Sequence, residues 1–408
     1  MDTETLLTDL QSLGLRLAGA AGTLPGRRGG AGPSDHAAVS VDGVTVMVPV
    51  HTAAAEGSPY TAQLGEDGAG VVERGGEILA PIRLVAAPRF YALATADGIL
   101  YPKIALLHGE DVLASTVLQS CVRYADPALT CAFCAIGQSL AAGRTIARKT
   151  PEQLAEVAEA ALRLDGIRQV TLTTGTPRAP DRGAAHLAAC ARAIKAATGL
   201  PIQAQCEPPE DFVWFERLRE AGVDNLGMHL EAVTPAARAA MLPGKAEVSV
   251  ERYHEAFAAA VGVFGRGLVS TYLIAGLGDP LDAIVEACAR LVEIGVYPFV
   301  VPLVPIRGTK LEASAPPSGE EMRALYARVG ALFERAGLRA EDTKAGCARC
   351  GACSSLSLFE GRRAPAERGG DDRGVPVPAR PERSADPRLP TLAPGDLLRR
   401  ARALRGHG

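Results

Sequence analysis

Several features that define protein classes are missing from this chain. Its formal net charge of −3 over 408 residues excludes a nucleic-acid-binding surface spread over the whole chain. No apolar run reaches the roughly 18–20 residues that span a bilayer, and the acidic N-terminus, MDTETLLTDL, lacks the positive region and apolar core of a secretory signal. Lysine is scarce, with 6 lysines among 43 basic residues, which we interpret as coding bias. A soluble protein of the reducing cytoplasm is expected.

Evenly paired cysteines are missing too. The nine cysteines fall into two close groups and three isolated residues: Cys121, Cys131 and Cys134; Cys347, Cys350 and Cys353; and Cys190, Cys206 and Cys288. An odd total with two close groups argues against a secreted disulfide scaffold. Thiolates grouped in this way are typical of metal sites. Cys190 and Cys288 lie on expected helices, and we interpret them as small buried apolar side chains.

The residue pattern divides the chain into four parts. Residues 1–110 are expected to hold an amphipathic helix at 4–18 and then a small β-rich module. Its short β-rich runs, separated by Gly and Asp signals, lie at 41–50, 70–74, 82–87 and 90–95, and a further run at 114–118 leads into the first cysteine group. Residues 338–360 carry the second cysteine group. Residues 361–408 have 11 arginines against 6 acidic residues and predict a disordered basic tail with room for a short helix at 396–404.

Residues 111–337 alternate between strand and helix patterns. The run Thr150-Pro151-Glu152-Gln153 is a strong helix start, and five further apolar strands, each followed by a helical stretch, extend to residue 336. Strand–helix repetition with apolar strands predicts an α/β fold with a parallel sheet covered by helices. With residues 114–120 as the first strand there are six β/α units, which favours a partial (β/α)6 barrel over a closed eight-unit barrel.

The first cysteine group follows the first barrel strand. In β/α architectures, the loops after the strands carry the chemistry. Three thiolates on one loop can bind three irons of a four-iron cluster and leave the fourth iron open. Cys131-x2-Cys134, with Phe133 before the last cysteine, and Cys121 upstream give the spacing C-x9-C-x2-C.

This loop resembles that of the radical S-adenosylmethionine (SAM) superfamily, which usually reads C-x3-C-x2-C with an aromatic residue before the last cysteine. Other segments resemble superfamily segments at strand ends: 173–176, which would meet the SAM amino group, and 227–231 and 276–279, which would contact its ribose, carboxylate or adenine. Segments 302–305 and 242–245 resemble the biotin-synthase-like branch. The resemblance covers about residues 115–336 and implies these cofactor-binding residues: Phe133, Thr174, Gly175, Thr176, Glu231, Gly276 and Gly278.

The resemblance also implies an activity. Cys121, Cys131 and Cys134 would hold a [4Fe–4S] cluster that binds SAM and cleaves it reductively, starting radical chemistry on a small-molecule substrate. An electron donor such as flavodoxin or ferredoxin would supply the electron. The identity of the substrate and the SAM bond that breaks do not follow from the sequence.

The second cysteine group, C-x2-C-x2-C, is typical of turns that wrap a cluster. Radical SAM enzymes often carry auxiliary clusters in C-terminal extensions, so the resemblance favours an iron–sulfur cluster on Cys347, Cys350 and Cys353 over zinc. Substrate, water or a distant residue such as Cys206 could supply the fourth ligand.

Simpler interpretations stand beside these. The glycines could be turn residues with positive φ, His229 an internal residue held by a hydrogen bond, and Arg148 and Lys149 ordinary charges before a helix rather than partners of the SAM carboxylate. The whole protein could instead be a zinc-binding β/α-barrel hydrolase, using His229 or Glu231, or a non-catalytic iron–sulfur electron carrier.

Overall fold

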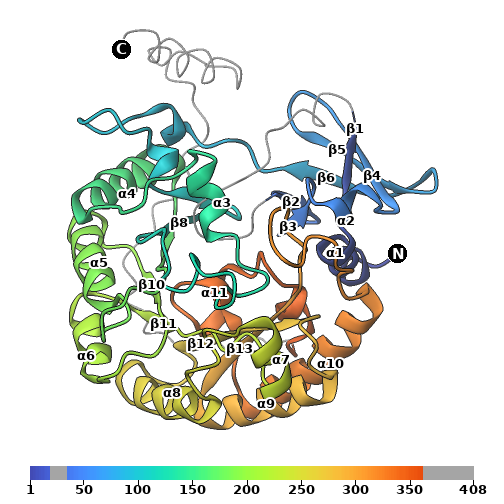
Figure 1. Cartoon of the computed structure of the whole chain (residues 1–408). Coiled ribbons are helices and arrows are strands. Elements are labelled where there is room, and N and C mark those ends of the chain that lie inside the picture. The colour runs from blue at the N-terminus through green and yellow to red at the C-terminus, as the bar shows by residue number, and fades with distance from the viewer. Residues whose placement is uncertain (19–34, 362–408) are drawn as a thin grey trace, which may run out of the picture.

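The computed structural model describes residues 1–18 and 35–361. These residues form two sheets, and the larger is curled with helices around its outside (Figure 1). Its strand order is β13-β12-β11-β10-β9-β8-β7, with all neighbours parallel except the β7–β8 hairpin. The strands are β7 (Leu106–His108), β8 (Val112–Thr116), β9 (Gln169–Thr173), β10 (Ile202–Gln205), β11 (Asn225–Gly227), β12 (Val269–Ala275) and β13 (Val296–Pro302).

Helices connect these parallel strands. They are α3 (Ile136–Ala141), α4 (Pro151–Asp165), α5 (Ala184–Thr198), α6 (Val213–Glu220), α7 (Pro235–Met241), α8 (Val250–Phe264), α9 (Leu281–Ile294) and, after the last strand, α10 (Gly319–Ala336). The order of six parallel strands with helices between them confirms the partial (β/α)6 barrel that the sequence predicts.

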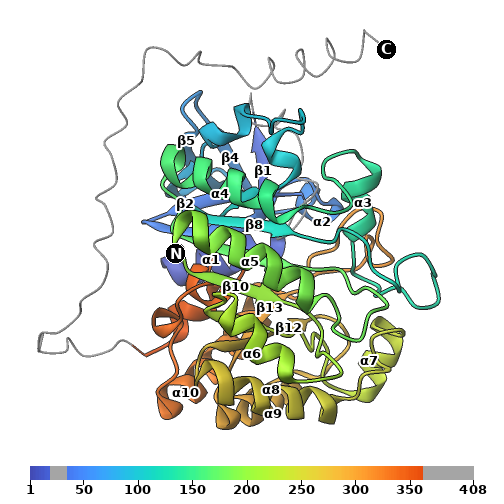
Figure 2. The ribbon, with the colours of Figure 1, turned by 90° about the vertical axis from the view of Figure 1, so that its left-hand side faces the viewer.

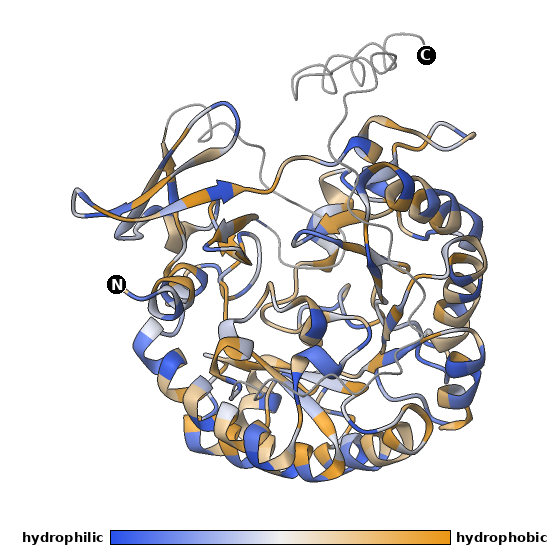
Figure 3. Cartoon of the chain, turned by 180° about the vertical axis from the view of Figure 1, so that it is seen from behind, coloured by the Kyte–Doolittle hydropathy of each residue, from blue (hydrophilic) through white to orange (hydrophobic). Residues whose placement is uncertain are grey.

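Local chemistry explains where the covering helices begin and end. Thr150 and Gln153 form a capping box at the start of α4, Pro151 occupies its first turn, and Gly166 ends it in the left-handed conformation. The apolar faces of these helices pack on the sheet in one continuous core, while hydrophilic residues face outward (Figure 3).

The smaller sheet belongs to the N-terminal module and has the order β1-β4-β5-β6-β2-β3. The elements of this module are α1 (Thr3–Leu13), β1 (Arg16–Ala18), β2 (His36–Val41), β3 (Val44–Pro49), α2 (Ala53–Glu56), β4 (Tyr60–Leu64), β5 (Ala69–Arg74) and β6 (Glu77–Leu84). It has its own apolar core. The module lies beside the open side of the partial barrel (Figure 1), where Asp9 of α1 forms an ion pair with Arg323 of α10.

Some local expectations were wrong. The run at 41–50 is not one strand, because Asp42 and Gly43 both have positive φ and turn the chain into the β2–β3 hairpin. Residues 90–95 do not form a strand, since a 3-10 turn occupies Arg89–Ala92. The antiparallel strand β7 was not anticipated. The basic tail expected at 361–408 lies outside the described residues apart from Gly361.

The two ends of the barrel carry different parts of the chain. The loop of residues 120–135 lies at the end where the parallel strands finish, and residues 338–360, with the short helix α11 (Cys347–Cys350), lie at the opposite end (Figure 2). Among the described residues, no helix combines the length and apolar character needed to cross a membrane.

Candidate metal and cofactor sites

The first cysteine group lies in a loop fixed by backbone hydrogen bonds. The N–H of Val122 donates to the carbonyl of Thr176 at 2.8 Å, which ties the residue after Cys121 to the turn after β9. The N–H of Ala132 donates to the carbonyl of Met241 at the end of α7, also at 2.8 Å. The loop is therefore held at both halves, although nine residues separate Cys121 from Cys131.

The structure brings the three thiols of this group into one neighbourhood. Burial raises the pKa of Cys131 to about 12, with the Glu231 carboxylate and the other two thiols adding to it. Burial also raises the pKa of Cys134 to about 11, and Cys121 contributes in the same direction. Thiols that disfavour one another's ionisation lie close together, and a cationic cluster is what would reverse that cost. The donor set and its position therefore fit a thiolate-bound cluster.

A cavity of about 270 Å³ lies on the inner side of the barrel next to this loop. Phe133 and Glu231 both line it. Glu231 has a φ of +68° and forms an ion pair at 2.8 Å with Lys245. Burial alone would lower the pKa of Lys245, but the Glu231 carboxylate more than offsets this and holds the pKa above its usual value. The positive charge of Lys245 thus already balances the negative charge of the Glu231 carboxylate.

The turn after β9 is tightly constrained. A side chain at Gly175 would overlap the backbone carbonyl of Ser120, so the two segments approach more closely than any other residue allows. The hydroxyl of Thr176 donates to Glu207 at 2.8 Å, whereas that of Thr174 donates to the carbonyl of Gly175, also at 2.8 Å.

Glu207 joins this turn to the cluster loop. It forms a buried ion pair with Arg123, whose Nε also donates to the carbonyl of Gly244 at 2.7 Å. The second carboxylate oxygen of Glu207, Oε2, is buried and has no hydrogen-bond partner among the described residues. A buried acceptor of this kind is costly unless a ligand donates to it.

Gly276 and Gly278 have φ values of +104° and +97°. The turn after β12 therefore requires glycine for its backbone alone, as the simpler interpretation of these residues holds. Their assignment as cofactor-binding residues stays a prediction.

Two other residues from the sequence have internal partners. His229 lies 3.1 Å from Gln205 through Nε2 and accepts the N–H of Tyr272 at Nδ1, and burial lowers its pKa to about 3. Lys149 is fully buried, and its Nζ donates to Thr145 at 2.7 Å and to the carbonyl of Ile146 at 2.9 Å. These contacts favour structural roles for both His229 and Lys149.

The second cysteine group closes the N-terminal end of the barrel. Three amide side chains near the starts of β9, β10 and β11 accept hydrogen bonds from backbone N–H groups of this segment. Gln169 accepts from Gly346, Gln203 from Cys347, and Asn225 from Ala345. The N-terminal module holds the other side, because the N–H of Met47 donates to the carbonyl of Ala352 at 2.7 Å. These bonds come from four separate strands, so the position of the cysteines is well defined.

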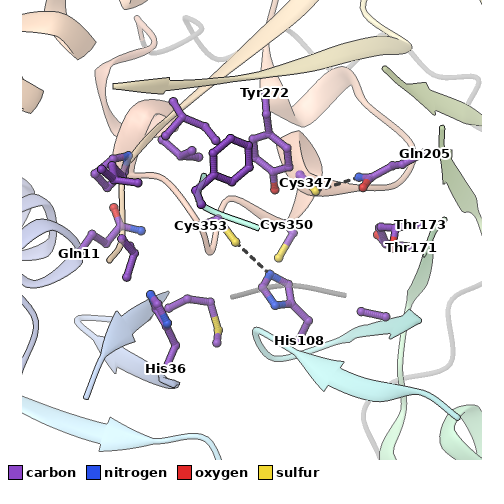
Figure 4. A pocket seen from close by; sticks show the side chains of 18 of the residues that line it. Gln11, His36, His108, Thr171, Thr173, Gln205, Tyr272, Cys347, Cys350 and Cys353 are labelled. Carbon is purple, nitrogen blue, oxygen red and sulfur yellow. Dashed lines mark hydrogen bonds between the residues drawn. The ribbon is translucent and has the colours of Figure 1, made fainter. Parts of the chain in front are cut away.

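The same cavity reaches from Phe133 and Glu231 to this second group. Cys347, Cys350 and Cys353 all line it (Figure 4). Gln205 donates to the Cys347 sulfur at 3.2 Å, and His108 lies 3.3 Å from the Cys353 sulfur. Cys206 instead packs in the apolar core and does not line this cavity, although Gln205 before it does. Cys206 is therefore not available as a fourth ligand for this group.

Neither group is arranged around a single ion. Within residues 1–18 and 35–361, no three His, Cys, Asp or Glu side chains are grouped so as to hold one metal ion. A zinc site needs its ligands around one point. An iron–sulfur cluster takes one thiolate for each iron, so its ligands stand further apart.

Comparison with known protein families gives the barrel an identity. Residues 127–308 match the model of the Radical SAM superfamily. These residues form a radical SAM domain. The matched segment includes Cys131, Cys134 and Glu231 and begins after Cys121. A radical SAM domain implies a [4Fe–4S] cluster and SAM as cofactors, and the parallel sheet is the partial barrel of this domain.

Individual relatives match over parts of their length. The chain is 29% identical over 136 residues to the bacteriochlorophyllide c C-7(1)-hydroxylase of Chlorobaculum limnaeum, covering 33% of this chain and 34% of that protein. The chain thus aligns with about a third of this relative. A radical SAM methyltransferase from Sphaerobacter thermophilus is similar with a TM-score of 0.44 and 15% identity, covering 70% of this chain and 76% of that one. For methylornithine synthase the TM-score is 0.43 and the identity 18%, with coverages of 55% and 62%.

Sequence reasoning assigned no role to four residues of these sites, although Lys245 lies in the segment 242–245 named above. Arg123, Glu207 and Lys245 form buried ion pairs around the radical SAM loop, and His108 lies beside the second group. Arg123 comes two residues after Cys121, which was a usable signal. His108 gave none, because a lone histidine before a turn glycine is common and its partner is 245 residues away.

Proposed function

We propose that this protein is a radical SAM enzyme in which Cys121, Cys131 and Cys134 hold a [4Fe–4S] cluster and Cys121 is the third ligand of the C-x9-C-x2-C motif. One observation carries the proposal. The loop holding the three thiols stands at the carboxyl end of the radical SAM barrel and faces a cavity lined by Phe133 and Glu231. When bound, the cluster supplies one electron that splits SAM reductively and so starts radical chemistry on the substrate.

The chain's own residues would bind and orient SAM and shield the cluster from water. The Thr174-Gly175-Thr176 turn would offer backbone oxygens to the SAM amino group, and Phe133 would shield the cluster and adenine from water. Glu231, held by Lys245, and the turn containing Gly276 and Gly278 complete the cofactor site. Reactive radicals need this exclusion of water, and the mainly apolar walls of the cavity favour it.

The substrate belongs in the cavity between the two cysteine groups. A cavity of about 270 Å³ suits a small molecule, and its walls are mainly apolar side chains such as Val112, Ile274 and Leu303. An electron donor such as flavodoxin or ferredoxin would supply the electron. Thiolate ligands require a reducing compartment, so we place the protein in the cytoplasm.

A second iron–sulfur cluster on Cys347, Cys350 and Cys353 is part of this proposal. Three thiols on one short segment line a cavity, and Gln205 already donates to one of their sulfurs. Hydrogen bonds to sulfur and burial are the means by which proteins adjust the potential of such clusters.

Anaerobic reconstitution tests the proposal. With both sites filled, the protein should bind about eight irons and, when reduced, convert SAM to methionine and 5′-deoxyadenosine, measured by mass spectrometry. The Cys121→Ala variant should lose about four irons and all SAM cleavage. Cys190→Ala is the matched control, since Cys190 is buried on α5 in the apolar core, and it should retain both.

Three outcomes would contradict the proposal in different ways. Zinc in place of iron would favour a hydrolase, and clusters without SAM cleavage would favour an electron carrier. SAM cleavage that survives Cys121→Ala would leave the enzyme class intact but remove Cys121 from the ligand set.

A further inference from the structure

We propose that His108 is the fourth protein ligand of the second cluster, which makes its ligand set Cys347, Cys350, Cys353 and His108. The inference rests on the second cluster of the proposed function and assigns its open position. With His108 in that position, the substrate would lie in the cavity between the two clusters and would not bind to the second cluster.

His108 lies close to Cys353 and points toward it. Nε2 of His108 lies 3.3 Å from Sγ of Cys353, and the two side chains point toward each other across the cavity with Cys350 beside them (Figure 4). His108 is only 6% exposed. Imidazole nitrogen is an accepted replacement for thiolate at iron–sulfur clusters. The nitrogen therefore has the chemistry of a ligand and shares the cavity with the three thiols.

The turn after His108 lies close to the cysteine segment. His108 ends β7, and Gly109 begins the tight turn into β8 with a φ of +60°. A Cβ on Gly109 would lie 3.2 Å from the Cys350 sulfur and 3.3 Å from Cβ of Ala352. The turn thus lies directly against the cysteine segment, and the absence of a side chain keeps that space clear.

Both the hairpin that carries His108 and the segment that carries the three cysteines are held in place. The β7–β8 hairpin is part of the barrel sheet, in which His108 pairs with Val112. The cysteine segment is fixed by Gln169, Gln203 and Asn225, and Ser354 donates to the carbonyl of Val300 at 2.5 Å. Two rigid elements far apart in sequence therefore present four donors to one cavity. Preorganised donors of this kind are what metal sites require.

The test uses the full chain with Cys121, Cys131 and Cys134 all changed to alanine, so that only the second site can hold iron. After anaerobic reconstitution and reduction, it should contain about four irons and show a strongly coupled nitrogen in pulsed electron paramagnetic resonance. Labelling histidine with ¹⁵N should change that signal. His108→Ala should abolish the nitrogen coupling completely. His108→Cys should keep the iron, lose the coupling and make the reduction potential more negative, because an anionic thiolate replaces a neutral ring.

His36→Ala is the matched control. His36 lines the same cavity and is equally buried, at 6% exposed, but lies on β2 of the N-terminal module. Its removal should leave the nitrogen signal unchanged. If the triple variant does not fold, the unaltered chain without SAM gives the same readout, since the first cluster then has no nitrogen ligand.

The outcomes separate the two proposals. Iron at the second site with no nitrogen coupling, or with a coupling that survives His108→Ala, overturns the assignment of His108 and leaves the second cluster standing. No iron at that site, or zinc instead, overturns the second cluster and the assignment of His108 to it. Loss of the signal in His36→Ala but not in His108→Ala would give the ligand position to His36.

Discussion

Nζ of Lys245 lies 2.8 Å from Oε2 of Glu231, and both side chains are nearly buried, with 9% and 14% of their surfaces exposed. Lys245 comes from the loop after α7, and Glu231 follows β11 with a φ of +68°. The pair therefore joins two segments of the radical SAM domain beside the cluster loop. A buried pair of this kind is costly to break from one side only, because the remaining charge has no partner.

Removing one partner should therefore destabilise the protein strongly. We expect Glu231→Gln to lower the free energy of unfolding by about 3–5 kcal/mol. The double variant Glu231→Gln, Lys245→Met should recover a large part of this loss. Urea unfolding of the apo protein measures all four corners of the cycle. Glu255→Gln, which breaks the exposed pair with Arg252, is the control and should cost about 1 kcal/mol or less. Equal losses of unfolding free energy in Glu231→Gln and Glu255→Gln would contradict the prediction.

Lys149 makes stability depend on pH. Burial lowers its pKa to about 7, whereas an unfolded lysine titrates near about 10.4. Between these values the unfolded chain binds more protons than the native one, so the free energy of unfolding should rise with pH from about 7 to about 10. Below about pH 7 both states are protonated, and the burial penalty is constant.

The variant Lys149→Met isolates this effect. Subtracting its unfolding free energy from that of the original chain at each pH should leave the rise due to Lys149, because other groups titrate alike in both proteins. Lys344→Met, at an exposed position, should give a flat difference. A flat difference for Lys149→Met would show that the native lysine keeps its ordinary pKa.

Gly109 and Gly75 form a matched pair for the second site. Both have a φ of +60°, but an added Cβ has open space at Gly75 and meets the Cys350 sulfur at 3.2 Å at Gly109. Both Ala variants should lose about 1–2 kcal/mol through backbone strain. Only Gly109→Ala should also lower the iron content, by up to about four irons. Iron analysis after reconstitution distinguishes them, and equal iron in both would show that the second site does not extend to this turn.

Gly175 plays the corresponding role at the first site. Its substitution by alanine would push away the carbonyl of Ser120, which directly precedes Cys121. We expect loss of about four irons and of SAM cleavage. Gly262→Ala, at an exposed helix position with no atom near the added Cβ, should keep both and stabilise the protein by about 0.5–1 kcal/mol. Full activity in Gly175→Ala would show that the turn can move without disturbing Cys121.

The sequence alone determined the barrel. Helix starts such as that at Thr150, the apolar strands and the alternation between them are local properties, so six parallel strands could be predicted and the pattern could be followed to residue 336, where α10 ends. The same local rules failed at 41–50, where a turn split one apolar run into two strands. The first cysteine group was recognisable because its members lie close in the chain, which is also how the radical SAM resemblance could be stated.

Only the tertiary structure decided how distant residues meet. Spacing along the chain carries no information about partners such as Glu231 with Lys245, or His108 with Cys353, because sheet closure and packing bring them together. The sequence likewise left Cys206 open as a ligand, whereas in the structure it follows the end of β10 and packs in the apolar core. Local chemistry thus sets the elements, whereas the curl of the sheet sets which side chains share one cavity.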